Sequence, residues 1–326
     1  MTPEESITPI KANLSEVLNP EIIHNVILKE KRPLHVYWGT APTGNSHCGY
    51  FVPMVKIAEL LHAGYCIKIL LADKHAHIDS LAPLESSLKA IGVDVSKLDK
   101  EYQADRFRFS NSIKVSQLLK AGSEVVKQGE NLTLGSLEYS ISQSLDEEYL
   151  NVDAELGGVD QRKLFTFAID NMPKLGYKVR AHLMNAMVPG LGDAQKMSLS
   201  EPSSKINLLD TPEGVAKKLR KVVYAPRQLE GNGVIAFIEH VIFRVESLKT
   251  GDKPRFTVET REGENLVYDI SKLKEDYASD ISTPQIVKPT LVKTLNKLLD
   301  LIRKDLKADD KWQRIGELAY LLRERS

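Results

Sequence analysis

The chain has 326 residues, of which 42% are hydrophobic and 27% charged. This balance is typical of a protein with a sizeable buried core, and it excludes mainly disordered, collagen-like and disulfide-scaffold proteins. At roughly 150 residues per domain, the length predicts about two domains. Lys and Arg number 44, as do Asp and Glu, so net charge alone indicates neither a nucleic acid nor an anionic membrane as partner. A slight basic excess over residues 211–326 is a weak indication of a polyanion partner.

The cysteine content and the N-terminus indicate the cellular compartment. Cys48 and Cys66 form neither a disulfide framework nor a zinc-ligand pattern, which fits a reducing compartment. Residues 1–10 include Glu4 and Glu5 and have no apolar core, so they are not a secretory signal. No apolar run reaches the roughly 18 residues of a membrane-spanning helix. We therefore expect a cytoplasmic protein with no membrane partner.

The first part of the chain predicts a strand–helix–strand unit. Residues 34–38 form a short apolar run of strand type, and a turn-rich stretch follows at 39–46. A helix is expected to start near His47, because apolar residues then recur at helical spacing up to Gly64. Residues 66–72 form a second apolar run of strand length. This order is typical of an α/β fold with a parallel sheet of Rossmann type.

Helices dominate the predictions for the remaining chain. Helical patterns cover most of 84–150 and all of 161–174, and a further strand is expected at 179–184. A loop rich in Gly, Pro and Ser runs from 187 to 204, and helices are then expected at 213–221, 232–242 and about 285–306. The last helix has one apolar stripe, formed by Ile286, Val287, Leu291, Leu295, Leu298, Leu299 and Ile302. The predicted divisions are a helical segment at 1–30, a catalytic domain at 31–209 with an insertion at about 80–135, and a mainly helical domain at 210–326.

The loop between the first strand and the first helix is a candidate phosphate site. In open α/β sheets, backbone N–H groups and the helix dipole point at an anion at this place. The loop has neither the GxGxxG fingerprint of dinucleotide sites nor the P-loop pattern. His47, at the helix start, could donate a hydrogen bond to a phosphate oxygen. It could equally be a capping or packed histidine.

A second candidate lies in the long loop, at Lys196-Met197-Ser198-Leu199-Ser200. A lysine among small polar residues suits an arm that closes over phosphates and stabilises the charge of a transition state. Taken alone, such a lysine is more often solvated and without a function.

Three polar residues of one predicted helix form the third candidate. Tyr139, Gln143 and Asp146 are spaced i, i+4 and i+7, so one face of a helix can present all three to a pocket. The alternative is an amphipathic surface helix with a few polar residues, in which Asp146 is a plain surface acid.

The two loops, about 150 residues apart, together resemble the HIGH and KMSKS signatures of class I aminoacyl-tRNA synthetases. Further segments narrow the resemblance to tyrosyl-tRNA synthetases of the eukaryotic and archaeal type. These segments are Tyr37–Thr40, Leu71–Asp73, Asp146–Leu150, Gly157–Lys163 and Met187–Leu191. The resemblance covers about residues 30–306 and is looser beyond about 245. It implies a Rossmann-type catalytic domain followed by a helical anticodon-binding domain.

The resemblance also implies roles for individual residues. Tyr37 and Asp146 would bind the phenol hydroxyl of L-tyrosine, and a carboxylate with a phenol at one hydroxyl would be left unpaired by phenylalanine. The ammonium end of tyrosine would be held by Tyr139, Gln143 and Gln161, although Gln161 could be a plain helix N-terminal residue. The pocket would be lined by Leu70, Ala72 and His75. The ATP contacts would be Gly39, Thr43, His47, Gly158, Asp160, Lys196 and Ser198.

A two-step reaction follows from the same resemblance. The tyrosine carboxylate would attack the α-phosphorus of ATP to give tyrosyl-adenylate and pyrophosphate, and the tyrosyl group would then pass to the 3′ end of tRNA(Tyr). The carboxylate is already ionised, so no general base is needed. Thr43, His47, Lys196 and Mg²⁺ would stabilise the developing charge, with no metal site formed by the protein alone.

The sequence also departs from the family pattern. Tyr50 replaces the last histidine of HIGH, and Leu199 replaces the second lysine of KMSKS. The 80–135 segment, which builds the dimer interface in this family, is short, although a homodimer is still expected. A His-Pro-Gly-Asp stretch that contacts the first anticodon base is replaced by Thr283–Ile286, which offers neither an aromatic ring nor a carboxylate. We therefore expect weak anticodon reading, with backbone affinity from Lys288, Lys293 and Arg303.

Two alternatives remain open at this point. A tryptophanyl-tRNA synthetase would share the fold, although Tyr37 with Asp146 favours a phenol over an indole. A catalytically idle tRNA-binding protein derived from a synthetase would share it too, although the ATP and tyrosine residues are all retained.

Overall fold

The computed structural model describes residues 7–8, 10–41, 46–72, 100–125, 132–190, 205–222, 226–251, 253–260, 262–311 and 313–314. The chain divides into two compact units, each discontinuous in sequence. Unit 1 comprises Met1–Thr43, Lys56–Ala186 and Ile315–Ser326, and unit 2 comprises Gly44–Val55 and Met187–Arg314. Among the described residues, no helix combines the length and the apolar character needed to cross a membrane.

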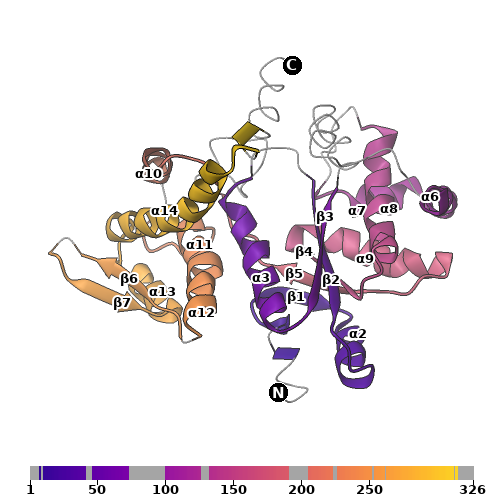
Figure 1. The fold of residues 1–326 in the computed structure, drawn as a ribbon, viewed down its shortest axis with the longest axis horizontal. Helices are drawn as coiled ribbons and strands as arrows, with labels where there is room; N and C mark the ends of the chain where they lie inside the picture. The colour runs from indigo at the N-terminus through magenta and orange to yellow at the C-terminus, as the bar shows by residue number, and fades with distance from the viewer. Residues whose placement is uncertain are drawn as a thin grey trace. The chain divides into compact units, whose positions relative to one another are not determined.

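Unit 1 contains a five-stranded sheet (Figure 1). Its strands are β1 (Leu14–Leu18), β2 (His35–Thr40), β3 (Cys66–Leu71), β4 (Ala154–Gly158) and β5 (Ala181–Asn185). The spatial order is β1-β5-β4-β2-β3. Strands β5, β4, β2 and β3 pair in parallel, and β1 pairs with β5 in the antiparallel direction. The expected α/β fold with a parallel sheet is confirmed.

Strands β4 and β5 are buried almost throughout, as in a parallel sheet covered by helices, whereas β3 is largely exposed. The helical segments of unit 1 are α2 (Pro20–His24), the π-helix η1 (Asn25–Lys29), α6 (Lys100–Ser112), α7 (Val115–Ala121), α8 (Leu134–Tyr149), the 3₁₀ helix η3 (Val159–Gln161), α9 (Arg162–Asn171) and the 3₁₀ helix η4 (Met172–Leu175). Helices α6 to α9 share a hydrophobic core that includes Phe109, Ile141, Leu145 and Phe167. This core fixes α8, which carries the polar face predicted from the sequence.

One helix belongs to both units. Helix α3 (Phe51–His62) follows the 3₁₀ helix η2 (Cys48–Tyr50). Its first turn, up to Val55, lies in unit 2, and the rest, from Lys56, lies in unit 1. In unit 1 the buried Lys56 ammonium donates to the Ala12 carbonyl oxygen over 2.7 Å. The connection from β2 to β3 therefore passes through unit 2.

Unit 2 is mainly helical. It contains α10 (Pro212–Lys221), α11 (Gly233–Phe237), the π-helix η6 (Ile238–Ile242), α12 (Phe243–Thr250), the hairpin strands β6 (Phe256–Glu259) and β7 (Asn265–Tyr268), α13 (Ile270–Ala278) and α14 (Pro284–Ala308). The predicted apolar stripe of α14 is confirmed, because Val287, Leu291, Leu295, Leu298 and Leu299 are buried in one core. Cys48 lies in the same core, with Phe51 and Val52 packed against it.

Three features differ from the sequence-based expectations: the strand β1, the strand β4, where no strand was expected, and the β6–β7 hairpin. Residues 1–30 were expected to be helical, but Leu14–Leu18 forms the edge strand β1. The β6–β7 hairpin lies in the domain expected to be mainly helical, at a place where no strand was predicted. In β6, buried and exposed residues alternate, as in a half-buried strand. The domain bounds at 30, 209 and 210 remain predictions, and residues 80–99 of the expected insertion lie outside the described residues.

Candidate functional site

Three polar side chains lie in one row across the sheet of unit 1. Glu155 of β4 is in register with Tyr37 of β2 on one side and with His182 of β5 on the other. Residues in register on adjacent strands point to the same face, so the three side chains are neighbours on that face. The Tyr37 and Glu155 side chains are buried and His182 is fully buried. A row of this kind is unusual for a buried parallel sheet, whose strands are generally apolar.

Helix α8 lies over this row and brings its polar face to the sheet. The Gln143 Nε2 donates to Glu155 Oε1 over 2.8 Å. The predicted face of Tyr139, Gln143 and Asp146 lines a pocket that is open to solvent. The full lining is Tyr37, Gly39, Thr40, Ala41, Leu70, Ala72, Tyr139, Gln143, Asp146, Glu155 and Gln161.

A glycine allows Gln161 to enter this pocket. A Cβ atom at Gly157 would lie 2.1 Å from Gln161 Oε1 and 2.5 Å from the Phe165 ring. The Gln161 carboxamide therefore lies directly over the backbone of β4, at the end of η3. Only glycine leaves room for this close approach.

Asp146 is held by a residue that the sequence analysis did not identify. The Tyr102 hydroxyl, from α6, donates to Asp146 Oδ1 over 3.2 Å and lies 3.3 Å from the Ser142 carbonyl oxygen. Tyr102 is buried, with its ring edge-on to Tyr149. Burial and the nearby Asp146 carboxylate raise the pKa of Tyr102 above its usual value, so the hydroxyl stays protonated and can donate.

Tyr37 is likewise a neutral phenol. Burial, with the carboxylates of Glu155 and Asp146, raises its pKa well above the usual value of tyrosine. Its hydroxyl lies 3.5 Å from the Gln143 carbonyl oxygen and forms a hydrogen bond with Glu155. The pocket therefore offers a phenol and a half-buried carboxylate, Asp146, for a ligand group that can both donate and accept.

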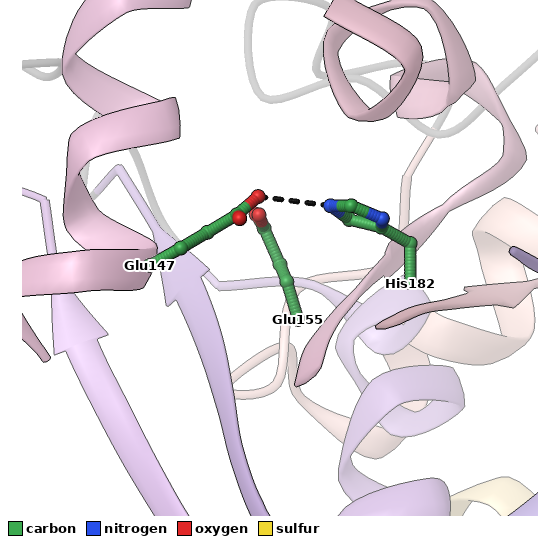
Figure 2. A group of neighbouring side chains, drawn as sticks. All are labelled: Glu147, Glu155 and His182. Carbon is green, nitrogen blue, oxygen red and sulfur yellow. Dashed lines mark hydrogen bonds and ion pairs between the residues drawn. The ribbon is translucent and has the colours of Figure 1, made fainter. Parts of the chain in front are cut away.

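Beneath the pocket, Glu147, Glu155 and His182 form a buried cluster (Figure 2). The His182 Nε2 and Glu147 Oε1 lie 2.8 Å apart, and the two carboxyl groups face each other. The His182 ring also stacks on Phe165, with ring centroids 4.6 Å apart. Burial lowers the pKa of His182 to about 4, and it raises the pKa of each glutamate to about 8. At neutral pH the imidazole is therefore neutral, and the two carboxyl groups do not both ionise.

His47 lies in unit 2, at the start of η2. Its Nδ1 accepts a hydrogen bond from the Gly49 N–H over 3.1 Å, so the capping role considered from the sequence is confirmed. Burial lowers its pKa to about 4, so the ring is neutral at physiological pH. Since Nδ1 is an acceptor, the proton of the neutral ring is on Nε2. Capping therefore leaves Nε2–H as a hydrogen-bond donor.

The structure brings together part of the predicted site. The pocket described above is lined by most of the predicted tyrosine-binding residues and by Gly39 of the predicted ATP set. The tyrosine-binding residues in it are Tyr37, Leu70, Ala72, Tyr139, Gln143, Asp146 and Gln161. Gly158 and Asp160 lie in the turn from β4 into η3 and do not line it. Thr43, His75, Lys196 and Ser198 lie outside the described residues. Sequence analysis missed Tyr102, Glu147, Glu155 and His182, which are joined only by long-range contacts.

Unit 2 corrects the charges expected near the first anticodon base. Arg303 is almost buried and bonds to Asp300, Asn296 and the Asp210 carbonyl oxygen, and the Lys288 ammonium donates to the Val222 carbonyl oxygen. Both side chains are partly buried and already bound within unit 2. Ile286 packs against the core, as considered from the sequence. The third expected charge, Lys293, is exposed and pairs with Glu259, and it lies with the exposed Lys249, Arg255 and Lys297 at a groove lined by α12, β6 and α14.

Comparison with known proteins identifies what this arrangement is similar to. The family model described as "tRNA synthetases class I (W and Y)" matches residues 29–95 and 95–300. A cytoplasmic tyrosine–tRNA ligase of Saccharomyces cerevisiae is 41% identical over 347 residues, which cover 98% of this chain and 88% of the relative. A cytoplasmic tyrosine–tRNA ligase of Xenopus tropicalis is 45% identical, over 93% of this chain and 61% of the relative. The crystal structure of a tyrosyl-tRNA synthetase from Archaeoglobus fulgidus, complexed with L-tyrosine, superposes with a TM-score of 0.80 at 29% identity, covering 94% of this chain and all of that one.

Proposed function

Because the chain belongs to the class I tRNA synthetases of the W and Y family and is a eukaryotic-type tyrosine–tRNA ligase, we propose that the pocket of unit 1 is its tyrosine site. Its substrates are ATP, L-tyrosine and tRNA, and its relatives are cytoplasmic enzymes, as expected for this chain from its sequence. The tryptophan alternative loses its support, since relatives with 41% and 45% identity are named as tyrosine ligases.

The phenol end of the pocket carries this proposal. Tyr37 and Asp146 line the pocket together, and Tyr102 holds the Asp146 carboxylate by a hydrogen bond. The hydroxyl of tyrosine donates to Asp146 and accepts from Tyr37, so that all three polar groups are paired. Phenylalanine would form neither of these two hydrogen bonds, so it would desolvate Asp146 and Tyr37 without compensation, which is costly. The arrangement thus selects for a phenol.

The ammonium end of the substrate faces three oxygen atoms. Gln143 has its amide nitrogen bound to Glu155, so its amide oxygen is the atom left to accept from a ligand. The Tyr139 hydroxyl and Gln161 Oε1 supply further acceptors at the pocket wall. An ammonium group has three donors and no acceptor, which matches this set.

The predicted ATP residues are proposed to act as follows. His47 contributes a neutral ring with Nε2–H as donor, which suits a phosphate oxygen. Gly39, Gly158 and Asp160 are proposed for the nucleoside. Thr43, Lys196 and Ser198, outside the described residues, are proposed for the phosphates. Together they position the ionised tyrosine carboxylate for attack on the α-phosphorus, which breaks the bond to pyrophosphate and forms tyrosyl-adenylate. In the second step a ribose hydroxyl of tRNA attacks the tyrosyl carbonyl carbon, forms the ester and displaces AMP.

Mg²⁺ is proposed to enter with ATP. Among the described residues, one group of three could offer metal ligands, Glu147, Glu155 and His182, and it does not suit this ion. Mg²⁺ prefers six oxygen ligands that include waters, whereas this group is buried and includes an imidazole. The substrate phosphates are the better ligands, so no protein residue is assigned to the ion.

The tRNA and dimer surfaces are proposed separately. The exposed basic side chains at the groove of unit 2 suit phosphate contacts, which give affinity without base identity. A homodimer is proposed from the family resemblance, and the exposed apolar side chains Phe107, Val115 and Leu134 on α6, α7 and α8 fit a covered surface. Light scattering coupled to size exclusion measures the dimer directly.

The decisive experiment is ATP–pyrophosphate exchange with tyrosine, tryptophan and phenylalanine in turn, followed by charging of tRNA transcripts. Exchange with tyrosine alone and formation of tyrosyl-tRNA are the expected results. Exchange with tryptophan would assign the pocket to the other branch of the family. No exchange with any amino acid, by a folded protein that binds tRNA, would support the idle binding protein.

A further inference from the structure

The buried cluster under the pocket has no role in the reaction described above. Its three polar side chains are Glu147, Glu155 and His182, all nearly inaccessible to solvent. Buried charges are costly and are seldom retained without a partner or a function. Two carboxyl groups that face each other in such a place call for an explanation (Figure 2).

The hydrogen bonds of the cluster identify where a proton is needed. Glu147 Oε2 is buried and has no donor among the described side chains, and the neighbouring Glu155 carboxyl has none to offer when ionised. His182 supplies one N–H, and its Nε2 already lies against Glu147 Oε1. A proton held on one carboxyl supplies the missing donor and removes the repulsion between two like charges. The pair then shares one proton and one negative charge.

Of the three cluster residues, Glu155 is the one that lines the pocket. Glu155 accepts from Gln143 Nε2 over 2.8 Å and forms a hydrogen bond with the Tyr37 hydroxyl, and it lines the pocket itself. Because the Gln143 amide nitrogen donates to the Glu155 carboxyl group, the amide oxygen is the end that faces the ligand. Glu147 on α8 and His182 on the neighbouring strand β5 hold Glu155 in this position.

We propose that Glu155 is a positioning residue for tyrosine recognition, and that the proton it shares with Glu147 keeps the Gln143 amide oxygen directed at the substrate ammonium group. This proposal rests on the proposed tyrosine site. Glu155 acts through Gln143 and Tyr37, so its loss weakens tyrosine binding and leaves the chemistry of adenylate formation in place.

Loss of the shared proton provides a readout that a merely structural residue would not give. The raised pKa values of about 8 for both glutamates place its release just above neutral pH. Above that pH, two ionised carboxylates repel each other, and Glu155 moves away from the position that holds Gln143. The charged and titratable groups that face the cluster are Tyr37 on β2, Asp146 and Glu148 on α8, and Arg180 beside β5.

The test compares Glu155→Leu and Glu155→Gln with the full-length wild-type enzyme. Glu155→Leu removes the acceptor, so the KM for tyrosine should rise at least tenfold at pH 7, with the KM for ATP and kcat in exchange within threefold. Glu155→Gln keeps an acceptor for Gln143, so it should restore the KM for tyrosine at pH 7. Between pH 7 and 8.5 the wild-type KM for tyrosine should rise at least threefold relative to Glu155→Gln, a comparison in which titration of free tyrosine cancels.

Two controls separate this proposal from its alternatives. Glu59→Leu removes a carboxylate of unit 1 that binds Lys56 and Asn13 and does not line the pocket, so it should leave the KM for tyrosine unchanged. The infrared spectrum of wild type at pH 7 should contain a protonated-carboxyl band that is lost in Glu155→Gln, as their difference spectrum shows directly. This readout does not depend on whether tyrosine is the substrate. The proposal is overturned by the absence of that band, by a wild-type KM in folded Glu155→Leu, or by a stoichiometric metal ion in the purified enzyme. Failure of the tyrosine site itself would instead appear as wild-type enzyme without tyrosine-dependent exchange.

Discussion

Replacing Asp146 with alanine tests the phenol-binding end of the pocket. Asp146 accepts from the Tyr102 hydroxyl, and in the proposed complex it also accepts from the hydroxyl of tyrosine. The substitution leaves Tyr102 with a second acceptor, the Ser142 carbonyl oxygen at 3.3 Å, so the protein side chain is not orphaned. The energetic cost therefore falls on the substrate hydroxyl.

An unpaired hydroxyl at a partly buried position costs about 1–3 kcal/mol. This range corresponds to a loss of roughly 5- to 150-fold in kcat/KM for tyrosine. The loss should not extend to phenylalanine, which has no hydroxyl to pair, so discrimination between the two amino acids should fall by about the same factor. The kcat/KM for both substrates in ATP–pyrophosphate exchange measures this directly.

The control for this variant is Asp170→Ala, which removes an exposed carboxylate of α9 outside the pocket and should leave exchange unchanged. Circular dichroism and thermal melting establish that the Asp146→Ala protein is folded. Near-normal tyrosine activation by that folded variant, or an equal loss for phenylalanine, would refute the assignment of Asp146 to the substrate hydroxyl.

Three further predictions concern other residues. Tyr102→Phe should raise the KM for tyrosine about 2- to 10-fold, because Asp146 loses one hydrogen bond, and should leave the KM for ATP unchanged; equal effects on both KM values would contradict it. Lys196→Ala should slow adenylate formation far more than it raises the dissociation constant for tyrosine, because the charge at pyrophosphate develops in the transition state; an unchanged pre-steady-state rate would make Lys196 a solvated loop residue. Transcripts that differ only in the first anticodon base should be charged with kcat/KM values within about tenfold of one another. The reason is that Ile286 packs against the core of unit 2 and that Arg303 is bound to other residues of this unit. A hundredfold loss, about 2.7 kcal/mol, would mean that other residues read this base.

The sequence predicts elements whose signal is local. The strands β2 and β3 are continuous apolar runs, and α14 has a regular stripe, so each could be placed from its own residues. Strand β1 has no such signal, because it is five residues long and has no fully buried side chain. Its strand form comes from pairing with β5, some 170 residues later in the chain. The hairpin β6–β7 did have a local signal, an alternation ending near Gly263, which has a φ of +83°.

The same distinction applies to the site. The spacing of Tyr139, Gln143 and Asp146 along one helix correctly places them in one pocket. Glu155 lies in β4, a strand that the sequence analysis did not predict, and its neighbours are set by the register of β4 with β2 and β5. Tyr102 reaches Asp146 only because α6 packs on α8. Contacts of this kind depend on the folded arrangement and not on spacing.

The helix that belongs to both units has a consequence for biosynthesis. Residues 46–52 contribute to the core of unit 2 and join it through the hydrogen bonds Cys48 N–H to Ile206 O, 2.8 Å, and Leu208 N–H to Ser46 O, 3.0 Å. A ribosome releases this segment long before residues 187–314, so unit 2 cannot complete its core until its second portion has emerged. Contacts of such large sequence separation slow folding. A gene divided between the codons for Ala186 and Met187 would also separate unit 2 from part of its own interior, so the two halves would have to be produced together to yield a folded enzyme.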